Sequence, residues 1–426
     1  MSPTQHSHLP LLILFSLAWR NIWRHRRRTL ITLSTIAIGF GLAVLSIGIG
    51  DGSHNSMIRN AIKLGEGHIT IQPRDYLEAP ANYKYIADGK SLAAQVEKLR
   101  IKGSVQPRIS LQVLASTANN SVGAGVEGIS ALDDPRAQML RPMLQEGEWL
   151  KPGDGRGLLI GDGMARKLKA KLGSKIVIMA GKQGGDSQAQ LGRVRGIFDS
   201  HVDELDDFLI LSDLQFAQRF LEGEGADLTA QPVTRFAIFI EDEEQMGLWK
   251  EQLRNTIDTT QLVALDWREM MPQLVQFIVI DDAGNYVFLM LILMLVVFGI
   301  INTVLMSVLE RTREFGLLRA LGMSRYHLLR LVFCESLLLS VLAVVIGWLV
   351  GGGLHFWFSR HGIDFSAMMA EGSSIMGTIM DPVVYTELSV DRVIQLTTII
   401  FVATLASGIY PAIKAARVTP VEALRT

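Results

Sequence analysis

The chain has 426 residues, of which 49% are hydrophobic and 19% are charged, whereas roughly 25% of the residues of an average soluble domain are charged. Its 41 basic and 42 acidic side chains give a formal net charge of -1, which excludes the bulk positive field of a nucleic-acid-binding protein. The single cysteine, Cys334, excludes a disulfide scaffold. The composition also excludes disordered and collagen-like chains, and it disfavours a simple soluble enzyme.

Residues 1–28 form a basic segment rich in aromatic side chains. Its large apolar side chains recur at helical spacing between arginines: Phe15, Trp19, Ile22 and Trp23. This pattern predicts an amphipathic helix that lies in the interface of a membrane.

Four later stretches are long and apolar enough to cross a bilayer, which takes roughly 20 residues. They are residues 29–50, 286–309, 331–354 and 393–413, and only Glu335 among them is charged. We therefore predict four transmembrane helices. For Glu335 we expect a structural or gating salt bridge with Arg311 or Arg330, and a proton or ion site is the alternative.

The orientation of these helices follows from the distribution of Lys and Arg, which accumulate on the cytoplasmic side. Thirteen lie in residues 1–28, 310–330 and 414–426, whereas residues 355–392 hold only Arg360 and Arg392. Both termini and the loop 310–330 are thus expected in the cytoplasm, with residues 51–285 and 355–392 outside it.

Residues 51–285 are long enough to fold as a domain of their own. Alternating strand patterns at residues 68–72, 175–179 and 236–240 mix with helical patterns at 91–99 and 243–257. The expected fold is therefore a bundle of four transmembrane helices carrying a large extracytoplasmic α+β domain.

The sequence offers no enzyme chemistry. Gly173-Ser174-Lys175 has the wrong order for a phosphate-binding loop, and the nine histidines lack metal-ligand spacing. The acidic run at residues 203–207 is interpreted as a solvated turn rather than a cation site. We assign no catalytic residue, metal or bound cofactor to this chain.

The short loop between the second and third spans predicts an amphipathic helix. Phe315, Leu318 and Leu321 recur at helical spacing and are expected on one side of the helix. Arg311 and Glu314 can pair three residues apart, and Gly322 can end the helix. Such a helix could also lie on lipid headgroups, with its arginines on phosphate.

This loop and the end of the chain together resemble the FtsX-like permeases of MacB-type ABC transporters, including the lipoprotein-releasing LolC/LolE-like branch. In the loop the resemblance rests on Glu310, Arg311, Arg313, Glu314, Phe315, Gly316, Leu318, Arg319, Leu321 and Gly322. In the tail it rests on Tyr410, Pro411, Ala412, Pro420, Glu422 and Leu424. The order of spans and outer domain is similar over essentially the whole chain, so the resemblance implies a MacB-like periplasmic domain and a multi-pass protein of the inner membrane.

What the resemblance implies is a non-catalytic permease. Its loop helix would dock on a separate cytoplasmic ABC ATPase dimer that binds ATP and Mg, because only 28 residues precede the first span. ATP hydrolysis would then move the outer domain without passing cargo between the spans. Further expected partners are a second permease copy or a paralogue, membrane lipids, and a periplasmic adaptor, chaperone or lipoprotein cargo; nucleic acid is not expected.

Lipoprotein or another lipid-linked molecule is the leading cargo. The glycine-rich residues 180–192 contain no proline, unlike the hook loop of lipoprotein-releasing members, and a partner permease could instead carry the hook that hands cargo to a chaperone. Tripartite efflux of peptides or toxins remains an alternative. A second alternative is a signalling permease that activates a cell-wall hydrolase, although the large outer domain favours transport.

Overall fold

The computed structural model describes residues 11–24, 26–181, 186–222, 228–321, 323–367, 374–375, 378–379 and 381–417. The chain divides into two compact units. The first, here called the helical unit, comprises Met1–His54, Val279–Asp364 and Val383–Thr426, and the second, the α+β unit, comprises Asn55–Ile278 and Phe365–Pro382.

The helical unit is built from long apolar helices. Its helices are α1 (Leu11–Arg24), α2 (Arg26–Leu64), α10 (Pro272–Glu310), α11 (Thr312–Ala320), α12 (Arg325–His361), α13 (Val390–Ser407) and α14 (Ile409–Ala416). A short ladder joins β11 (Ile363–Asp364) to β14 (Val383–Val384). Among the described residues, four helical segments can span a membrane by length and composition: α2, α10, α12, and Val390–Ala416, which covers α13 and α14.

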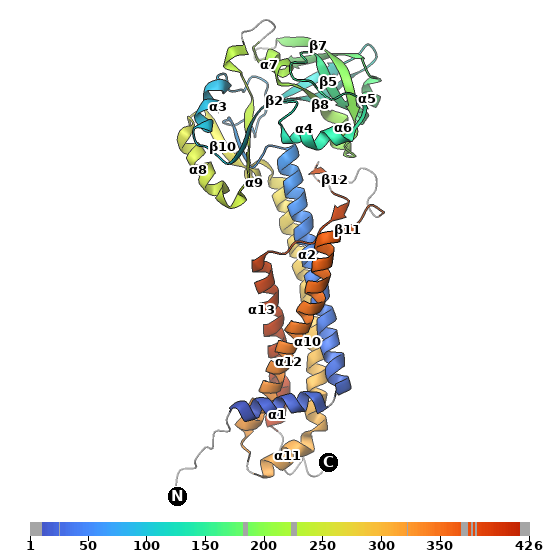
Figure 1. Cartoon of the computed structure of the whole chain (residues 1–426), viewed down its shortest axis with the longest axis vertical. Coiled ribbons are helices and arrows are strands. Elements are labelled where there is room, and N and C mark those ends of the chain that lie inside the picture. The colour runs from blue at the N-terminus through green and yellow to red at the C-terminus, as the bar shows by residue number, and fades with distance from the viewer. Residues whose placement is uncertain are drawn as a thin grey trace. The chain divides into compact units, whose positions relative to one another are not determined.

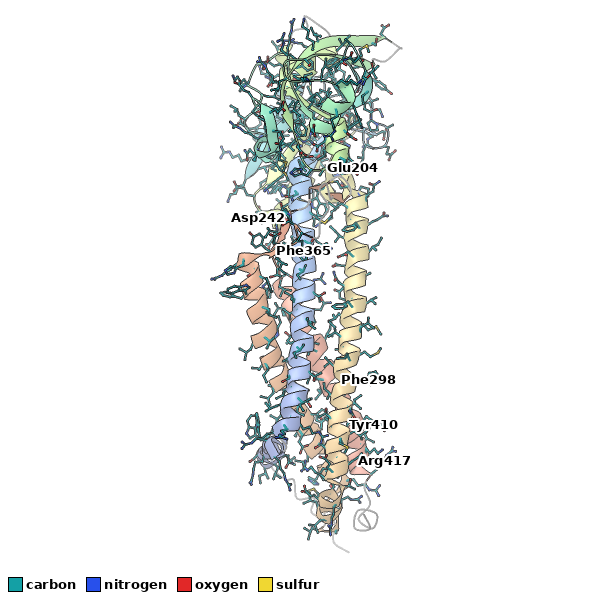
Figure 2. The ribbon with its side chains drawn as sticks, turned by 90° about the vertical axis from the view of Figure 1, so that its right-hand side faces the viewer. Glu204, Asp242, Phe298, Phe365, Tyr410 and Arg417 are labelled. Carbon is teal, nitrogen blue, oxygen red and sulfur yellow. The ribbon has the colours of Figure 1, made fainter. Side chains whose placement is uncertain are left out.

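Small and apolar side chains hold these helices together. Phe40, Val44 and Ile400 are fully buried between them. A Cβ atom on Gly347 would lie 2.0 Å from the ring of Phe40, so α12 approaches α2 as closely as a glycine allows. The outer surfaces remain apolar, since Phe298 projects from α10 with 64% of its surface exposed (Figure 2). Such faces suit contact with lipid tails.

The short helix α1 lies across the end of this bundle, at a steep angle to the long helices (Figure 1). Leu14, Ala18 and Ile22 are buried, and the first two pack with Leu331 and Cys334 of α12. The opposite side of α1 exposes Trp19 at 45%. This arrangement agrees with the amphipathic pattern in the sequence.

Within its described residues, the α+β unit contains one mixed sheet of ten strands. Its strands are β1 (Ile69–Pro73), β2 (Gly103–Ser116), β3 (Ser121–Ile129), β4 (Leu144–Gly147), β5 (Gly157–Gly161), β6 (Lys175–Gly181), β7 (Ser187–Phe198), β8 (Leu209–Asp213), β9 (Arg235–Ile240) and β10 (Leu262–Asp266). Their order is β10-β1-β9-β2-β3-β8-β5-β7-β4, with β6 paired to β2 and β7. The pairs β3–β8 and β5–β7 are parallel and the others antiparallel.

Seven short helices cover this sheet in the described residues. They are α3 (Gly89–Glu97), α4 (Pro135–Leu140), α5 (Asp162–Leu168), α6 (Asp203–Phe208), α7 (Leu214–Glu222), α8 (Met246–Thr256) and α9 (Trp267–Met270). Figure 1 shows α3 and α8 at one side of the unit and α4, α5 and α6 at the other. A separate small ladder pairs β12 (Ser374–Ile375) with β13 (Thr378–Ile379). The α+β fold expected for this part of the chain is confirmed.

Two buried arginines hydrogen-bond to the carbonyl groups at the C-terminal end of α2. Arg108 donates to the carbonyl oxygen of Gly65, and Arg136 donates to those of Leu64 and Gly65. Positive charge at this position complements the helix dipole. Arg108 in turn forms a bidentate ion pair with Asp134, at 2.6 and 2.8 Å.

A further set of ion pairs continues this network toward β9. Arg136 lies 2.9 Å from Glu127, and Arg235 lies 3.0 Å from Glu127 and 2.6 Å from Glu66. Burial alone would raise the pKa of Glu127, but the charges of Arg235 and Arg136 outweigh it and lower that pKa to about 2. The carboxylate therefore stays ionised throughout the physiological range.

We expect Glu127→Gln to lower the free energy of unfolding by about 3–5 kcal/mol at neutral pH, because two buried arginines lose their shared countercharge. A lowered folded-state pKa stabilises the fold above the unfolded pKa, and this contribution disappears as the pH falls toward 2. The gap between the variant and the wild type should therefore shrink between pH 5 and pH 2. This gap is measured by thermal unfolding, monitored by near-UV circular dichroism. The control is Glu148→Gln, an exposed position at which the free energy of unfolding should not change. A gap independent of pH would contradict the assignment.

Candidate functional site

The loop between α10 and α12 folds as the helix α11, near the end of the bundle that carries α1 (Figure 1). Arg311 separates Glu310, the last residue of α10, from Thr312, the first residue of α11. The predicted helix is therefore present, although it is shorter than the motif that indicated it. Ser324 then caps α12, because its side chain accepts from the backbone N–H of His327.

One side of α11 is packed into the chain itself. Phe315 is fully buried and Gly316 is buried beside it. Phe315 shares a cluster with Val308 of α10, Val332 of α12 and Ala412 of α14, and Leu318 packs against the same cluster. The structure thus joins the two segments on which the sequence resemblance rests, since Ala412 and the buried Pro411 belong to the tail motif.

The other side of α11 faces away from the chain. Leu317 and Leu321 are 54% and 77% exposed, and Arg313 and Ala320 are exposed beside them. The prediction that Leu321 shares a side with Phe315 is wrong. The reason is that α11 ends at Ala320, so that Leu321 lies in the turn after it.

A chain of charged and polar groups links α11 to its neighbours. Arg311 lies 3.1 Å from Glu335 and 3.2 Å from Glu314, and its guanidinium stands 5.1 Å from the centre of the Phe315 ring. Asn21 of α1 donates to Glu335 at 2.6 Å. Of the two partners expected for Glu335, the structure contains Arg311, whereas Arg330 instead donates to Tyr326.

Two more ion pairs complete this end of the helical unit. Arg24 of α1 lies 2.8 Å from Glu314, and Arg28 of α2 lies 3.0 Å from Glu310. The roles of Asn21, Arg24 and Arg28 were not predicted, because partners about 300 positions apart leave no local pattern. We call the set Asn21, Arg24, Arg28, Glu310, Arg311, Glu314 and Glu335 the coupling network.

The remaining predicted residues contribute less to this arrangement. Arg319 is half-buried on α11. Tyr410 is 55% exposed on α14 and projects from it (Figure 2). Gly322, Pro420, Glu422 and Leu424 lie outside the described residues.

The helical unit holds a second polar cluster that the sequence did not reveal. Arg392 at the start of α13 lies 3.2 Å from both Asp51 and Asp282, and it donates to Tyr286. His54 lies 2.9 Å from Asp281. One signal could have revealed it, because Arg392 is one of two basic residues in the acidic segment 355–392.

Within the described part of the chain, no group of three or more His, Cys, Asp or Glu side chains could hold a metal ion. In both clusters, arginines form ion pairs with carboxylates of neighbouring helices. The clusters therefore connect helices to one another.

The sequence matches two family models that agree with this architecture. Residues 286–420 match the FtsX-like permease C-terminal family, and residues 29–256 match the MacB-like periplasmic core domain. Together the matches define a membrane permease subunit of an ABC transporter. The chain belongs to the family of FtsX-like permeases that carry a MacB-like periplasmic core domain, which confirms the resemblance of its loop and tail.

Individual relatives share this organisation at low identity. The chain is 22% identical to an uncharacterized ABC transporter permease of Methanocaldococcus jannaschii, over 97% of each protein. It is also 22% identical to the lipoprotein-releasing system transmembrane protein LolE of Haemophilus influenzae, over 96% of this chain and 98% of that protein. The crystal structure of the periplasmic region of MacB from Actinobacillus actinomycetemcomitans aligns with 52% of this chain and 97% of its own, with a TM-score of 0.34 and 14% identity.

We expect the ion pair of Arg311 and Glu335 to be energetically coupled. Arg311→Met or Glu335→Met alone leaves an uncompensated charge in a nearly buried site, where the exposed side-chain fractions are 9% and 12%, and should cost about 3–5 kcal/mol. The double variant should recover most of this loss, because two apolar side chains of similar size need no countercharge. Thermal unfolding in detergent measures all three, with Arg313→Met as the exposed control. Additive losses in the double variant would rule out the coupling.

Proposed function

We propose that this chain couples ATP hydrolysis by a separate ATPase dimer to movement of its MacB-like domain. The observation that carries the proposal is the two-sided packing of α11. Phe315 packs its inner side against α10, α12 and α14, while Arg313, Leu317 and Ala320 are exposed on its outer side and Leu321 is exposed in the turn that follows. A protein groove that bound this outer side would hold a rigid element rather than a flexible loop.

The coupling network supports transmission of force from α11. A displacement of α11 acts on α12 through Arg311 and Glu335, and on α1 through Glu314 and Arg24. Buried, hydrogen-bonded charges hold one geometry because any other leaves them unpaired. The helices α2 and α10 each continue unbroken from one unit into the other, so movement of the helical unit reaches the MacB-like domain through the backbone itself.

The proposed site of action is the cytoplasmic (inner) membrane, with both termini and α11 in the cytoplasm and the MacB-like domain in the periplasm. The bias of Lys and Arg supports this orientation. ATP and Mg bind to the partner ATPase. The spans associate with a second permease copy or a paralogue.

We further propose that lipoprotein or another lipid-linked molecule is the cargo. The support is the relative LolE, named for lipoprotein release, which matches this chain over nearly the full length of both proteins. To test this cargo, cells are depleted of the chain, and membrane fractionation then locates an acylated reporter lipoprotein. Retention of the reporter in the inner membrane is the expected result, and unchanged sorting would contradict it.

The ATPase-docking role of α11 predicts that Leu317→Asp and Leu321→Asp each reduce retention of the ATPase on immobilised permease by more than tenfold. Loss of an apolar anchor in a packed interface commonly costs about 2 kcal/mol or more. Leu248→Asp is a matched control, since Leu248 is exposed to 55% on α8 and Leu317 to 54%. Phe315→Ala is unsuitable, because emptying a fully buried site destabilises the permease itself.

Two results would reject this docking role. One is full retention of the ATPase by both aspartate variants. The other is ATP hydrolysis by the purified permease alone, since the proposal places turnover on the partner. Correct folding of each variant is checked by its thermal unfolding curve beside that of the wild type.

The proposed orientation predicts selective labelling of introduced cysteines. Ser187→Cys in the MacB-like domain should react with an impermeant maleimide in cells whose outer barrier is opened, whereas Arg313→Cys on α11 should not. Both positions are exposed, and Cys334 is buried and gives little background. Labelling is measured as a mass shift on a gel. Labelling of Arg313→Cys alone would show that the orientation is the reverse of the one proposed.

A further inference from the structure

The MacB-like domain contains a strongly basic cavity of about 620 Å³, within the range of roughly 300–1,000 Å³ typical of ligand pockets. It is lined by residues of β6, β7 and α7 and of the turn before β5; Figure 1 shows β5 and β7 side by side in this unit. The charged residues of its lining are Asp154, Arg156, Lys175, Arg193, Arg195 and Arg219. Five positive charges thus meet one negative charge, although the whole chain has a net charge of -1.

Strand pairing places three of these cations next to one another. At Arg193, β7 lies between two neighbours: the partner of Arg193 is Lys175 on β6 and Gly157 on β5. The backbone N–H of Arg193 also donates to the carbonyl oxygen of Arg156 at 2.7 Å. The side chains of Arg156, Lys175 and Arg193 are all exposed, so a ligand can reach them from solvent.

This grouping of cations is unfavourable in the free protein. Like charges directly opposite one another on two strands destabilise a sheet, and Lys175 and Arg193 are such a pair. Among the described residues, neither side chain has an ion pair or a hydrogen bond, and the side chain of Arg156 has none either. Local arrangements that oppose stability are expected where the residues serve binding.

The two remaining arginines are held in place by the turn before β5. The Nε of Arg195 lies 2.9 Å from Asp154, whose carboxylate also accepts from the backbone N–H of Gly157 at 3.1 Å. Arg219 donates to the carbonyl oxygen of Gly155 at 3.3 Å. A Cβ atom on Gly155 would lie 2.9 Å from Nη2 of Arg219, so the glycine leaves room for the guanidinium. Side chains that are already held in position lower the entropic cost of binding a ligand.

We propose that this cavity binds an anionic ligand that carries two phosphate groups. Asp154 offsets one of the five positive charges, which leaves four cations for a ligand. A phosphate monoester carries about 1.5 to 2 negative charges at neutral pH, so two such groups match four cations. Arginine also binds phosphate through two parallel hydrogen bonds. A carboxylate brings only one charge, so an acidic peptide would need four carboxylates within the same cavity.

This site does not depend on the proposed coupling role. The cavity belongs to the α+β unit and α11 to the helical unit, and binding in the cavity needs neither ATP nor a second subunit. Failure of phosphate binding would therefore leave the coupling role untouched. Conversely, failure of α11 to bind an ATPase would say nothing about the cavity.

The test uses the full chain in a neutral detergent, with binding followed by microscale thermophoresis at low salt. Glucose 1,6-bisphosphate is the soluble probe, and diacylglycerol pyrophosphate in the same micelles is the lipid probe. Tighter binding of the first would identify the ligand as a soluble phosphorylated molecule, and tighter binding of the second as a lipid headgroup. In both cases added salt should weaken binding, because it screens charges at an exposed site.

Variants of the facing cations locate the site. Lys175→Gln and Arg193→Gln should each weaken the affinity about tenfold, since each removes a charge-assisted hydrogen bond, whereas Arg193→Lys keeps the charge and should lose less. Neither glutamine variant should lower the unfolding temperature, because each relieves the repulsion between the two strands. Arg254→Gln is the matched control, since Arg254 is exposed on α8 and does not line the cavity.

Three results would overturn the proposal. The first is that neither probe binds at millimolar concentration. The second is that both glutamine variants bind the probes as tightly as the wild type. The third is that hexa-aspartate binds more tightly than either phosphorylated probe, which would assign the cavity to an acidic polypeptide.

Discussion

The ion pair between Arg311 and Glu335 fixes the arrangement of the helical unit. Both side chains are nearly buried, and removing two charges from water is costly unless their remaining hydrogen-bonding groups are also satisfied. Asn21 binds the carboxylate, Glu314 binds the guanidinium, and the ring of Phe315 lies within reach of the same cation. These partners come from α1, α11 and α12, so the pair joins the three helices to one another.

The same principle recurs in the MacB-like domain, where arginines close the C-terminal end of α2. Arg108 and Arg136 bind the last carbonyl groups of the helix, and each is neutralised by a carboxylate from the sheet or from a following loop. At its other end, α2 is tied to α10 through Arg28 and Glu310. The 39 residues of α2 are thus anchored by charge near both ends and by apolar packing between them.

The sequence predicted what depends on local patterns. Uninterrupted apolar runs indicated the spans, and alternation indicated strands that agree with β1, β6 and β9. The continuation of α2 to Leu64 was not visible, because the apolar pattern stops at Asp51 and polar residues follow. Spacing within the loop indicated the pairing of Arg311 with Glu314, whereas Asn21 could not be matched to Glu335 over 314 positions.

The division of α11 into a sealed side and an open side also has an evolutionary consequence. Phe315 and Gly316 are buried, so substitutions there disturb the packing, and selection for stability acts against them. Changes at Leu317 or Leu321 leave the fold intact, so these positions can diverge together with whatever surface they meet. Under the proposed docking role of α11, duplicated copies of such a chain could therefore acquire different ATPases by changing a few exposed side chains, while the packing of the helices stays the same.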